Sequence, residues 1–215
     1  MEKKKGWKYW ISWIALAIWD WEIEGIMPQG VDKMMIVVAP HRKGFADVAL
    51  GWFVQNMQPI PPRLVGMKAE LFTMLGGIFK KSLERIGGIP IDRERKLGSG
   101  VEKGGFIQLI RNRVDSDDEI AVILTPEGTR KFELIETEFG ILDKGHYFFK
   151  GFWVIAVEKK LLVVLAAYNY RNKVVSLSEP FYFTGDLDDD MDRVFNWYRE
   201  KVPWYWPNID KSKFV

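Results

Sequence analysis

His41 and Asp47 are the first pair of side chains whose types and spacing suit chemistry. His41 follows the apolar run Met34–Ala39 and Pro40, so a buried strand would present its imidazole at the strand's end. An imidazole has an unperturbed pKa of about 6.5, which lets it accept a proton near neutral pH, and a neighbouring carboxylate fixes its tautomer and stabilises the imidazolium. The pair is therefore predicted to work as a general base and its orienting acid. The alternative is a polar strand end followed by an ordinary acid in the first turn of a helix.

Two later segments place an arginine at the end of a short apolar run. The first, Gly87–Arg93, opens with a pair of glycines, and the second, Leu124–Arg130, repeats the arrangement further along the chain. A guanidinium offers a planar fork of donors that suits bidentate contacts with phosphate. The alternative for each arginine is a structural ion pair, with Asp92 or Glu127 as the partner.

In their order and spacing, these three segments resemble the blocks of the glycerolipid acyltransferases, the family that includes lysophosphatidic acid acyltransferase. The resemblance runs from about Trp21 to Tyr182, and Lys150–Ala156 followed by Val163–Ala166 is similar to the family's fourth block. It implies transfer of a fatty acyl group from an acyl thioester, either acyl-coenzyme A or acyl-carrier protein, to the hydroxyl of a lysophospholipid such as lysophosphatidic acid. It implies no further cofactor.

The resemblance also assigns site residues. His41 would be the catalytic base and Asp47 its partner. The acceptor would be bound by Gly88, Pro90, Arg93, Glu127, Gly128, Thr129 and Arg130. The family places four residues between its His and Asp, whereas this chain has five, and a bulge at Gly44 would restore the contact because glycine tolerates unusual backbone angles. The alternative function is a catalytically impaired member that acts as a lipid-binding or membrane-surface protein.

Charge and composition exclude several other classes of function. The 31 basic and 29 acidic residues give a net charge of only +2, which argues against a nucleic-acid binder that must neutralise many phosphates. The chain has no cysteine and two histidines, so disulfides, thiolate metal sites and cysteine nucleophiles are excluded, and no metal site is expected. Of the two histidines, His146 has no partner at a useful spacing and is interpreted as a surface-loop residue.

The first 21 residues carry five of the ten tryptophans behind a cluster of lysines. The apolar stretch Tyr9–Trp19 is shorter than the roughly 20 residues that a bilayer-spanning helix needs. Indole rings favour the headgroup boundary, so we expect a helix over residues 1–21 that lies in a membrane interface. Its interfacial side chains would be Trp7, Trp10, Trp13 and Trp19. The protein would then be a monotopic or peripheral protein at the cytoplasmic face of a membrane. The alternative is a helix packed on its own domain through Trp10, Ile14, Ala17 and Trp21.

Beyond this segment, residues 22–215 are predicted to form a single α/β domain, with a mixed, largely parallel sheet flanked by helices. Strand and helix patterns alternate along the chain. Strands are expected at 34–39, 63–68, 87–93, 120–124, 161–170 and 173–177, and helices at 46–57, 75–86, 98–113, 148–159 and 186–201. Ligands of such sheets bind beyond the carboxyl ends of the strands, so His41, Arg93 and Glu127 would meet at one edge. Residues 131–147 match no part of the family pattern.

Overall fold

The computed structural model describes the sheet, its helices and the segment that carries His41. The described residues are 6–41, 45–58, 60–68, 80–85, 87–91, 105–126, 134–137, 140–143 and 150–204. The strands are β1 (Glu22–Glu24), β2 (Lys33–Ala39), β3 (Arg63–Lys68), β4 (Gly88–Ile91), β5 (Ile120–Leu124), β6 (Leu134–Thr137), β7 (Gly140–Asp143), β8 (Leu162–Asn169) and β9 (Val174–Leu177). The helices are α1 (Trp7–Ile18), α2 (Phe45–Met57), α4 (Lys80–Arg85), α5 (Gly105–Ser116), α6 (Gly151–Glu158) and α7 (Leu187–Lys201).

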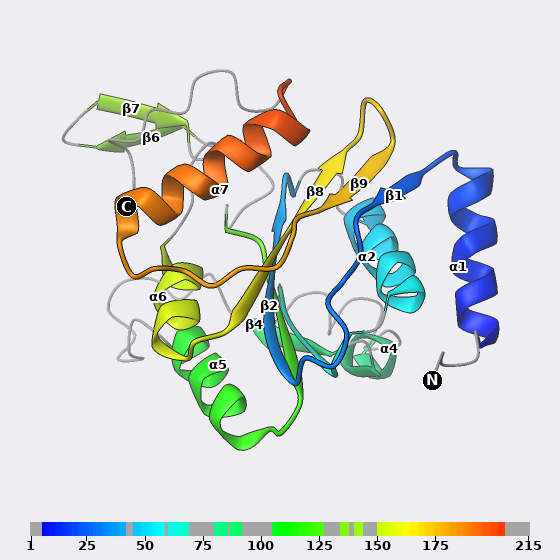
Figure 1. Cartoon of the computed structure of the whole chain (residues 1–215), viewed down its shortest axis with the longest axis horizontal. Coiled ribbons are helices and arrows are strands. Elements are labelled where there is room, and N and C mark those ends of the chain that lie inside the picture. Colours follow the sequence, from blue (N-terminus) through cyan, green and yellow to red (C-terminus); the bar gives the residue numbers. More distant parts are fainter. Residues whose placement is uncertain are drawn as a thin grey trace.

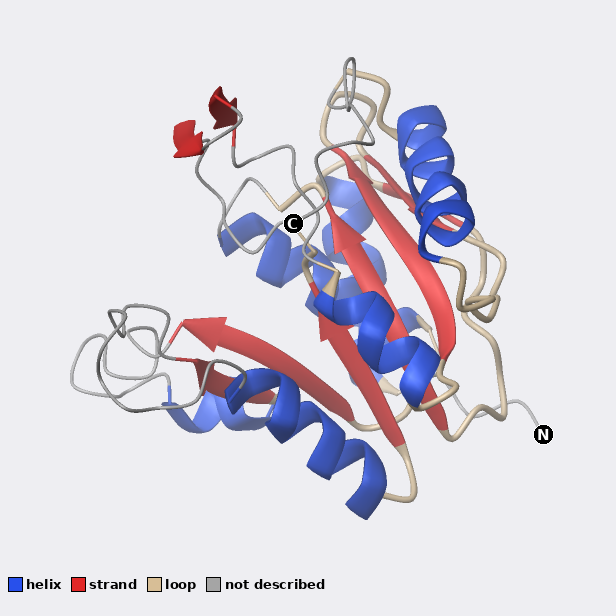
Figure 2. Cartoon of the chain, turned by 90° about the vertical axis from the view of Figure 1, so that its left-hand side faces the viewer, coloured by secondary structure: helices blue, strands red, loops and turns tan. Residues whose placement is uncertain are grey.

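Seven strands form one sheet in the order β1-β9-β8-β2-β5-β3-β4, while β6 and β7 pair as a separate antiparallel hairpin (Figure 1). Within the large sheet, β8 and β9 are antiparallel and the other neighbouring pairs are parallel. Helices cover both faces of this sheet (Figure 2). The prediction of an α/β fold with a largely parallel sheet is therefore confirmed.

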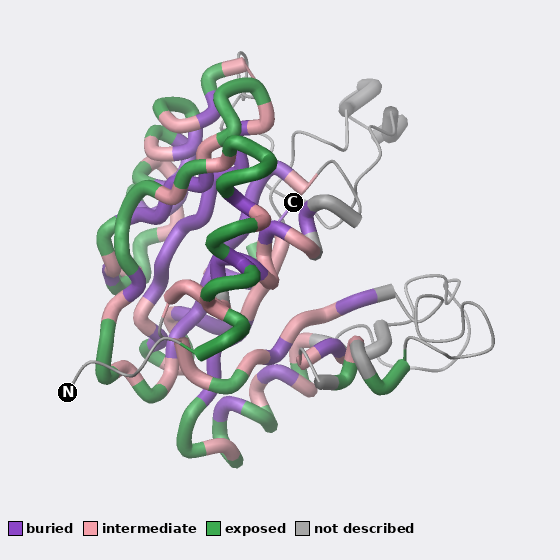
Figure 3. The backbone as a smooth tube through the Cα atoms, turned by 90° about the vertical axis from the view of Figure 1, so that its right-hand side faces the viewer, coloured by how far each residue is buried: buried purple, intermediate pink, exposed green. Residues whose placement is uncertain are grey.

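Strand β2 lies at the centre of the sheet and is buried on both of its faces. From Met34 to its end, each residue is at most 7 % exposed (Figure 3). Successive side chains of a strand point to opposite faces, so Met35 and Val37 join the core beneath α5, α6 and α7, while Ile36 and Val38 join the core beneath α1 and α2. A run that is apolar on both faces is typical of a central parallel strand. The buried strand therefore fixes the position of Ala39, from which the segment with His41 begins.

Helix α7 is anchored to the centre of the sheet. At its start, the Asp186 side chain accepts hydrogen bonds from the backbone N–H groups of Asp188 and Asp189, which caps the helix. The buried residues of the helix are Asp190 and the apolar side chains Met191, Val194, Phe195 and Tyr198. The Tyr198 hydroxyl donates to the carbonyl of Val37 over 2.6 Å. This bond ties the last helix to β2 two residues before the strand ends.

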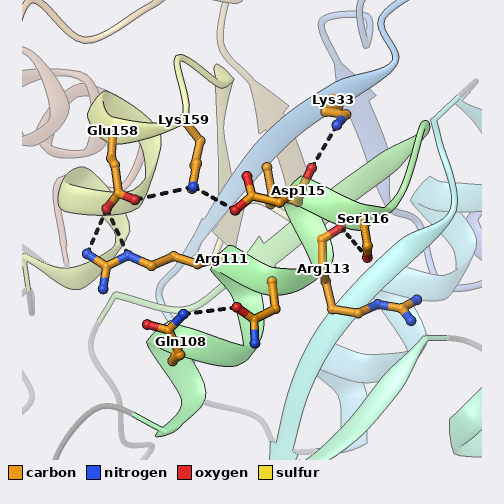
Figure 4. A network of polar contacts seen from close by, with 10 residues as sticks. Lys33, Gln108, Arg111, Arg113, Asp115, Ser116, Glu158 and Lys159 are labelled. Carbon is orange, nitrogen blue, oxygen red and sulfur yellow. Dashed lines mark hydrogen bonds and ion pairs between the residues drawn. The ribbon is translucent and has the colours of Figure 1, made fainter.

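An ion-pair network braces α5 against α6 near the start of β2 (Figure 4). Arg111 Nη2 lies 2.7 Å from Glu158 Oε2, and Lys159 Nζ lies 2.8 Å from Asp115 Oδ2 and 3.3 Å from Glu158 Oε1. Hydrogen bonds from Arg111 and then Lys159 lower the pKa of Glu158. Lys33, at the start of β2, donates to a backbone carbonyl of α5 over 2.7 Å. Exposed ion pairs contribute little to stability, so this network orients the two helices rather than holding the fold together.

Several elements differ from the sequence predictions. Strand β1, which pairs in parallel with β9, and the β6–β7 hairpin within residues 131–147 were not predicted. Helix α5 continues to Ser116, beyond the predicted end at Arg113. Residues 75–79 and 98–104, at the predicted starts of two helices, lie outside the described residues. Within the described ranges, no helix has the length and apolar content needed to span a bilayer.

Candidate active site

The central strand and the following helix bring His41 and Asp47 into contact. β2 ends at Ala39, and His41 follows after Pro40, while Asp47 lies in the first turn of α2. His41 Nδ1 lies 2.8 Å from Asp47 Oδ2. The His41 side chain is 16 % exposed and that of Asp47 is 4 % exposed. Five intervening residues are therefore compatible with the His–Asp contact. The predicted bulge at Gly44 lies outside the described residues, because 42–44 are not among them.

This geometry suits a general base. When Nδ1 donates to a carboxylate, the neutral imidazole carries its lone pair on Nε2, the nitrogen that is then able to accept a proton. The buried carboxylate of Asp47 also stabilises the positive charge that forms on His41 after proton transfer. The arrangement is thus able to remove a proton from a substrate hydroxyl placed against Nε2.

An apolar cavity of about 110 Å³ adjoins the pair, and both His41 and Asp47 line it. Its wall on the sheet comes from five strands, and representative residues are Ile36 of β2, Val65 of β3, Ile123 of β5, Ala166 of β8 and Val175 of β9. Helix α2 closes the other side with Trp52 and Val54. A hydrocarbon placed in this cavity would lie between the sheet and α2, with one end beside the imidazole.

Tyr168 is a cavity residue that sequence analysis missed. It is the residue before the end of β8, it is 5 % exposed, and it lines the cavity together with His41 and Asp47. Burial, and to a smaller extent the negative charge of Asp47, raise the pKa of the Tyr168 hydroxyl well above its usual range. The available signal was its place at the end of an apolar strand whose carboxyl end would reach the same edge as His41.

The structure gives a partial view of the predicted acceptor-binding residues. Gly88 and Pro90 lie on β4. A Cβ at Gly88 would lie 2.8 Å from the carbonyl oxygen of Leu83 and 2.9 Å from Met67 Sδ, so this glycine permits close packing of α4 and β3. The remaining predicted residues, Arg93, Glu127, Gly128, Thr129 and Arg130, lie outside the described residues, as does His146.

The strand directions nevertheless constrain where two of these predicted segments begin. β4 and β5 are each parallel to β3, and β5 is parallel to β2, so their carboxyl ends point to the edge of the sheet that carries His41. Arg93 follows the end of β4 by two residues, and Glu127 follows the end of β5 by three.

Among the described residues, no group of three or more His, Asp or Glu side chains is able to hold a metal ion.

Three of the predicted interfacial tryptophans lie on α1 and the fourth, Trp19, directly follows it, and α1 packs on the outer side of α2 (Figure 1). Trp7, Trp10, Trp13 and Trp19 are between 49 % and 67 % exposed. The residues of α1 that are buried are Ser12 and Leu16. The alternative packing stripe of Trp10, Ile14, Ala17 and Trp21 is therefore wrong for its first three members, which are exposed. Trp21 is half-buried and contacts Tyr170 edge to face.

Comparison with known proteins places this geometry in a family. The family model described as Acyltransferase matches residues 22–169, which is more than half of the chain and contains both His41 and Asp47. Among curated proteins, no match to the chain is found. The matched region extends from β1 to the end of β8, so it includes the strand that carries the base, the helix that carries its partner and most of the cavity wall. The chain therefore belongs to the acyltransferase family, and it is an acyltransferase.

Proposed function

We propose that this acyltransferase moves a fatty acyl group from a coenzyme A or carrier-protein thioester to the hydroxyl of a lysophospholipid such as lysophosphatidic acid. The observation that carries the proposal is the 2.8 Å contact between His41 and Asp47 at the wall of an apolar cavity. An acyl chain in that cavity would bring its thioester carbonyl to the imidazole. Confinement of the reacting groups in this way is itself a large source of rate acceleration.

In the proposed reaction, His41 Nε2 removes the proton from the acceptor hydroxyl while that oxygen attacks the thioester carbonyl carbon. The tetrahedral intermediate then collapses, the bond from carbon to sulfur breaks, and the leaving thiolate takes the proton from the imidazolium. Asp47 holds the imidazole in place throughout and balances its positive charge. Backbone N–H groups in the first turn of α2, which a helix leaves unpaired, would stabilise the negative oxygen. No covalent acyl-enzyme forms.

The acceptor would be held through its phosphate by Arg93 and Arg130, which the family resemblance assigns to that role. The directions of β4 and β5 support this assignment, because both strands lead toward the edge that carries His41. Arginine suits the task because its fork of donors matches two phosphate oxygens at once.

Helix α1 would dock the enzyme on the cytoplasmic face of a membrane, where a lysophospholipid resides. Its exposed surface carries Trp7, Trp10, Ile11, Trp13, Ile14, Ile18 and Trp19. Lys8 lies beside the Trp7 ring, 5.9 Å from its centroid, and further lysines precede the helix in the sequence. Aromatic rings favour the headgroup boundary, and each lysine near an anionic surface contributes about 1 kcal/mol. An anionic lipid surface thus fits both the apolar area and the positive charge.

The alternative of a catalytically impaired lipid-binding member rested on the additional residue between His41 and Asp47. Because the two side chains are in contact, the additional residue is no longer a reason to expect impaired catalysis. Deleting Ala46 would restore the spacing of the family, but it would shorten the connection between His41 and α2 by one residue and so disturb the contact between His41 and Asp47. We expect the deletion to lower the rate of acyl transfer, and a gain of activity would favour the impaired alternative.

The test is an acyl-transfer assay with purified protein, lysophosphatidic acid and either acyl-coenzyme A or acyl-carrier protein over several chain lengths. We expect phosphatidic acid from at least one donor. His41→Ala should lower the rate by about 10²- to 10⁴-fold, because that is the usual contribution of a general base. His146→Ala, which removes the other histidine, should leave the rate unchanged. Absence of product with both donors, or an undiminished rate for His41→Ala, would contradict the proposal.

A further inference from the structure

Tyr168 reaches from the end of β8 toward the helix that carries Asp47. In the sheet, Ala167 of β8 pairs with Ala39 of β2, so Tyr168 follows at the level of the segment that leads to His41. Its side chain belongs to the core on the α2 side of the sheet, together with Ala166. The phenol is therefore held between the sheet and α2, beside the catalytic pair.

The hydroxyl lies against a glycine of α2. Gly51 is four residues after Asp47, which places the two on the same face of the helix. A Cβ at Gly51 would lie 3.3 Å from the Tyr168 hydroxyl oxygen, tighter than an ordinary contact. Glycine inside a helix is unfavourable relative to alanine, so its presence here has a packing reason. The missing side chain leaves room for the hydroxyl one helical turn away from Asp47.

This hydroxyl has no protein partner in the described part of the chain. Tyr168 is 95 % buried, yet its hydroxyl makes no hydrogen bond with any described residue, and it lines the cavity together with His41 and Asp47. A phenol is protonated at neutral pH, and burial raises the pKa of this one further, so it is available as a donor. The hydroxyl oxygen is not sealed in the core but is accessible from the cavity, so the oxygen of a ligand bound there is able to accept its hydrogen bond.

We infer that the Tyr168 hydroxyl donates a hydrogen bond to an oxygen atom of the acyl group bound in the cavity, an inference that rests on the proposed acyl-transfer function. Two oxygens would satisfy it. One is the carbonyl oxygen of the thioester, which every acyl donor carries. The other is a hydroxyl on the acyl chain near its carbonyl, in which case Tyr168 makes the enzyme selective for hydroxylated chains, because a polar group left unpaired by a plain chain disfavours that chain.

Binding of three unreactive pantetheine probes tests the inference without requiring turnover. The first probe is an alkyl thioether with no oxygen on the chain. The second is the matching ketone, in which a methylene separates sulfur from carbonyl so that transfer is impossible, and the third is that ketone with a hydroxyl two carbons beyond the carbonyl. Dissociation constants for the wild type and Tyr168→Phe are measured by calorimetry. The substitution keeps the ring and removes only the hydroxyl.

We expect Tyr168→Phe to leave the dissociation constant of the alkyl probe unchanged and to raise that of an oxygen-bearing probe by about threefold to tenfold, the usual range for one hydrogen bond. An equal loss with both ketones assigns the bond to the carbonyl, and a loss confined to the hydroxylated ketone assigns it to the chain. The inference is overturned if all three probes weaken alike, if none does, or if the wild type binds none of them.

Gly51→Ala provides a second, independent variant that should fold, because alanine favours the helix. Its Cβ would press on the hydroxyl, so we expect weaker binding of the same oxygen-bearing probe and little further loss when it is added to Tyr168→Phe. Fully additive losses would contradict a shared hydrogen bond. If the probes bind as expected but no acyl transfer occurs with any donor, the proposed reaction fails while the binding role of Tyr168 stands.

Discussion

Helices α1 and α7 lie near opposite ends of the chain, and they bury opposite kinds of surface. α7 buries large apolar side chains such as Met191 and Phe195 against the sheet and exposes most of its charged residues, with Asp190 as a buried exception. α1 buries Ser12 and Leu16 and exposes large apolar side chains, of which Ile18 is the most exposed. One helix thus turns its apolar face toward its own domain, and the other turns most of its apolar surface outward.

The comparison shows that apolar content alone does not identify a helix's partner. In α7, apolar residues recur at helical spacing among charged ones, so one face of the helix is apolar and the sheet covers it. In α1, apolar residues surround the helix, and a stripe containing Ser12 and Leu16 is enough to attach it to α2. A helix that is apolar all round is typical of a buried or lipid-facing segment. Because α1 is exposed rather than buried, its composition favours a lipid surface as the partner of its outer face.

A buried residue of α7 should contribute far more to the free energy of unfolding than an exposed residue of α1. Met191→Ala removes a fully buried side chain of α7, and we expect it to lower the free energy of unfolding by about 2–5 kcal/mol through lost burial and the cavity left behind. Ile18→Ala is the matched change on α1, at a residue that is 75 % exposed, and it should alter that free energy by no more than about 0.5 kcal/mol. Urea denaturation measures both. Equal losses would show that the exposed face of α1 supports the fold.

The next effect concerns binding to lipid. Trp10→Ala together with Trp13→Ala should weaken sedimentation with anionic vesicles, on the order of 2 kcal/mol or roughly thirtyfold for each ring withdrawn from water. Added salt should weaken the remaining attraction of the lysines. Substitution is a cleaner test than deletion of residues 1–20, because Leu16 belongs to the core that α1 shares with α2.

Trp197→Ala, on α7, is the control for this experiment because it removes the same ring from the other helix. Sedimentation of this variant should match that of the wild type. If the double α1 variant also matches the wild type, or if the wild type never sediments with vesicles, the assignment of α1 to a lipid surface is wrong.

The smallest effect concerns the polar contact that fixes which face of α1 is buried. Ser12 Oγ donates to the carbonyl of Lys8 over 2.9 Å and accepts from Asn56 Nδ2 of α2 over 3.2 Å. Ser12→Ala should lower the free energy of unfolding by about 1 kcal/mol. A double-mutant cycle with Asn56→Ala should reveal a coupling of about 0.5–1.5 kcal/mol. Zero coupling would mean that the apolar contact of Leu16 alone sets the orientation.

Much of the fold was predictable because the signals are local. The bounds of β3 and β5 agree with the sequence prediction, and the predicted start of α2 differs by one residue, since apolar runs and helical spacing mark these elements. β1 was missed because Glu22–Glu24 is short and carries two charges, and it becomes a strand only by pairing with β9, about 150 residues later. Such a pairing leaves no signal in the segment itself.

In the candidate active site, too, one contact was predictable from the sequence and another was not. The contact of His41 with Asp47 was predictable because a strand end and the first turn of the next helix lie close in the chain. The role inferred for Tyr168 was not, since a tyrosine in a strand usually indicates packing. Its meaning depends on Gly51, which is distant in sequence and adjacent only in the fold. The spacing of residues in the sequence therefore gives no sign of the contact between β8 and α2.

We propose that Asp47 and His41 act together as the base of an acyl transfer, and the rate of acyl transfer by Asp47→Asn is the sharpest test of this pairing. The substitution keeps the size of the side chain and removes its charge, so His41 loses the carboxylate that lies 2.8 Å from Nδ1. We predict a rate of acyl transfer to lysophosphatidic acid about 10²- to 10⁴-fold below that of the wild type at neutral pH, with an unchanged free energy of unfolding as the check on folding. A folded Asp47→Asn variant that transfers acyl groups at the wild-type rate would show that His41 does not need the carboxylate of Asp47.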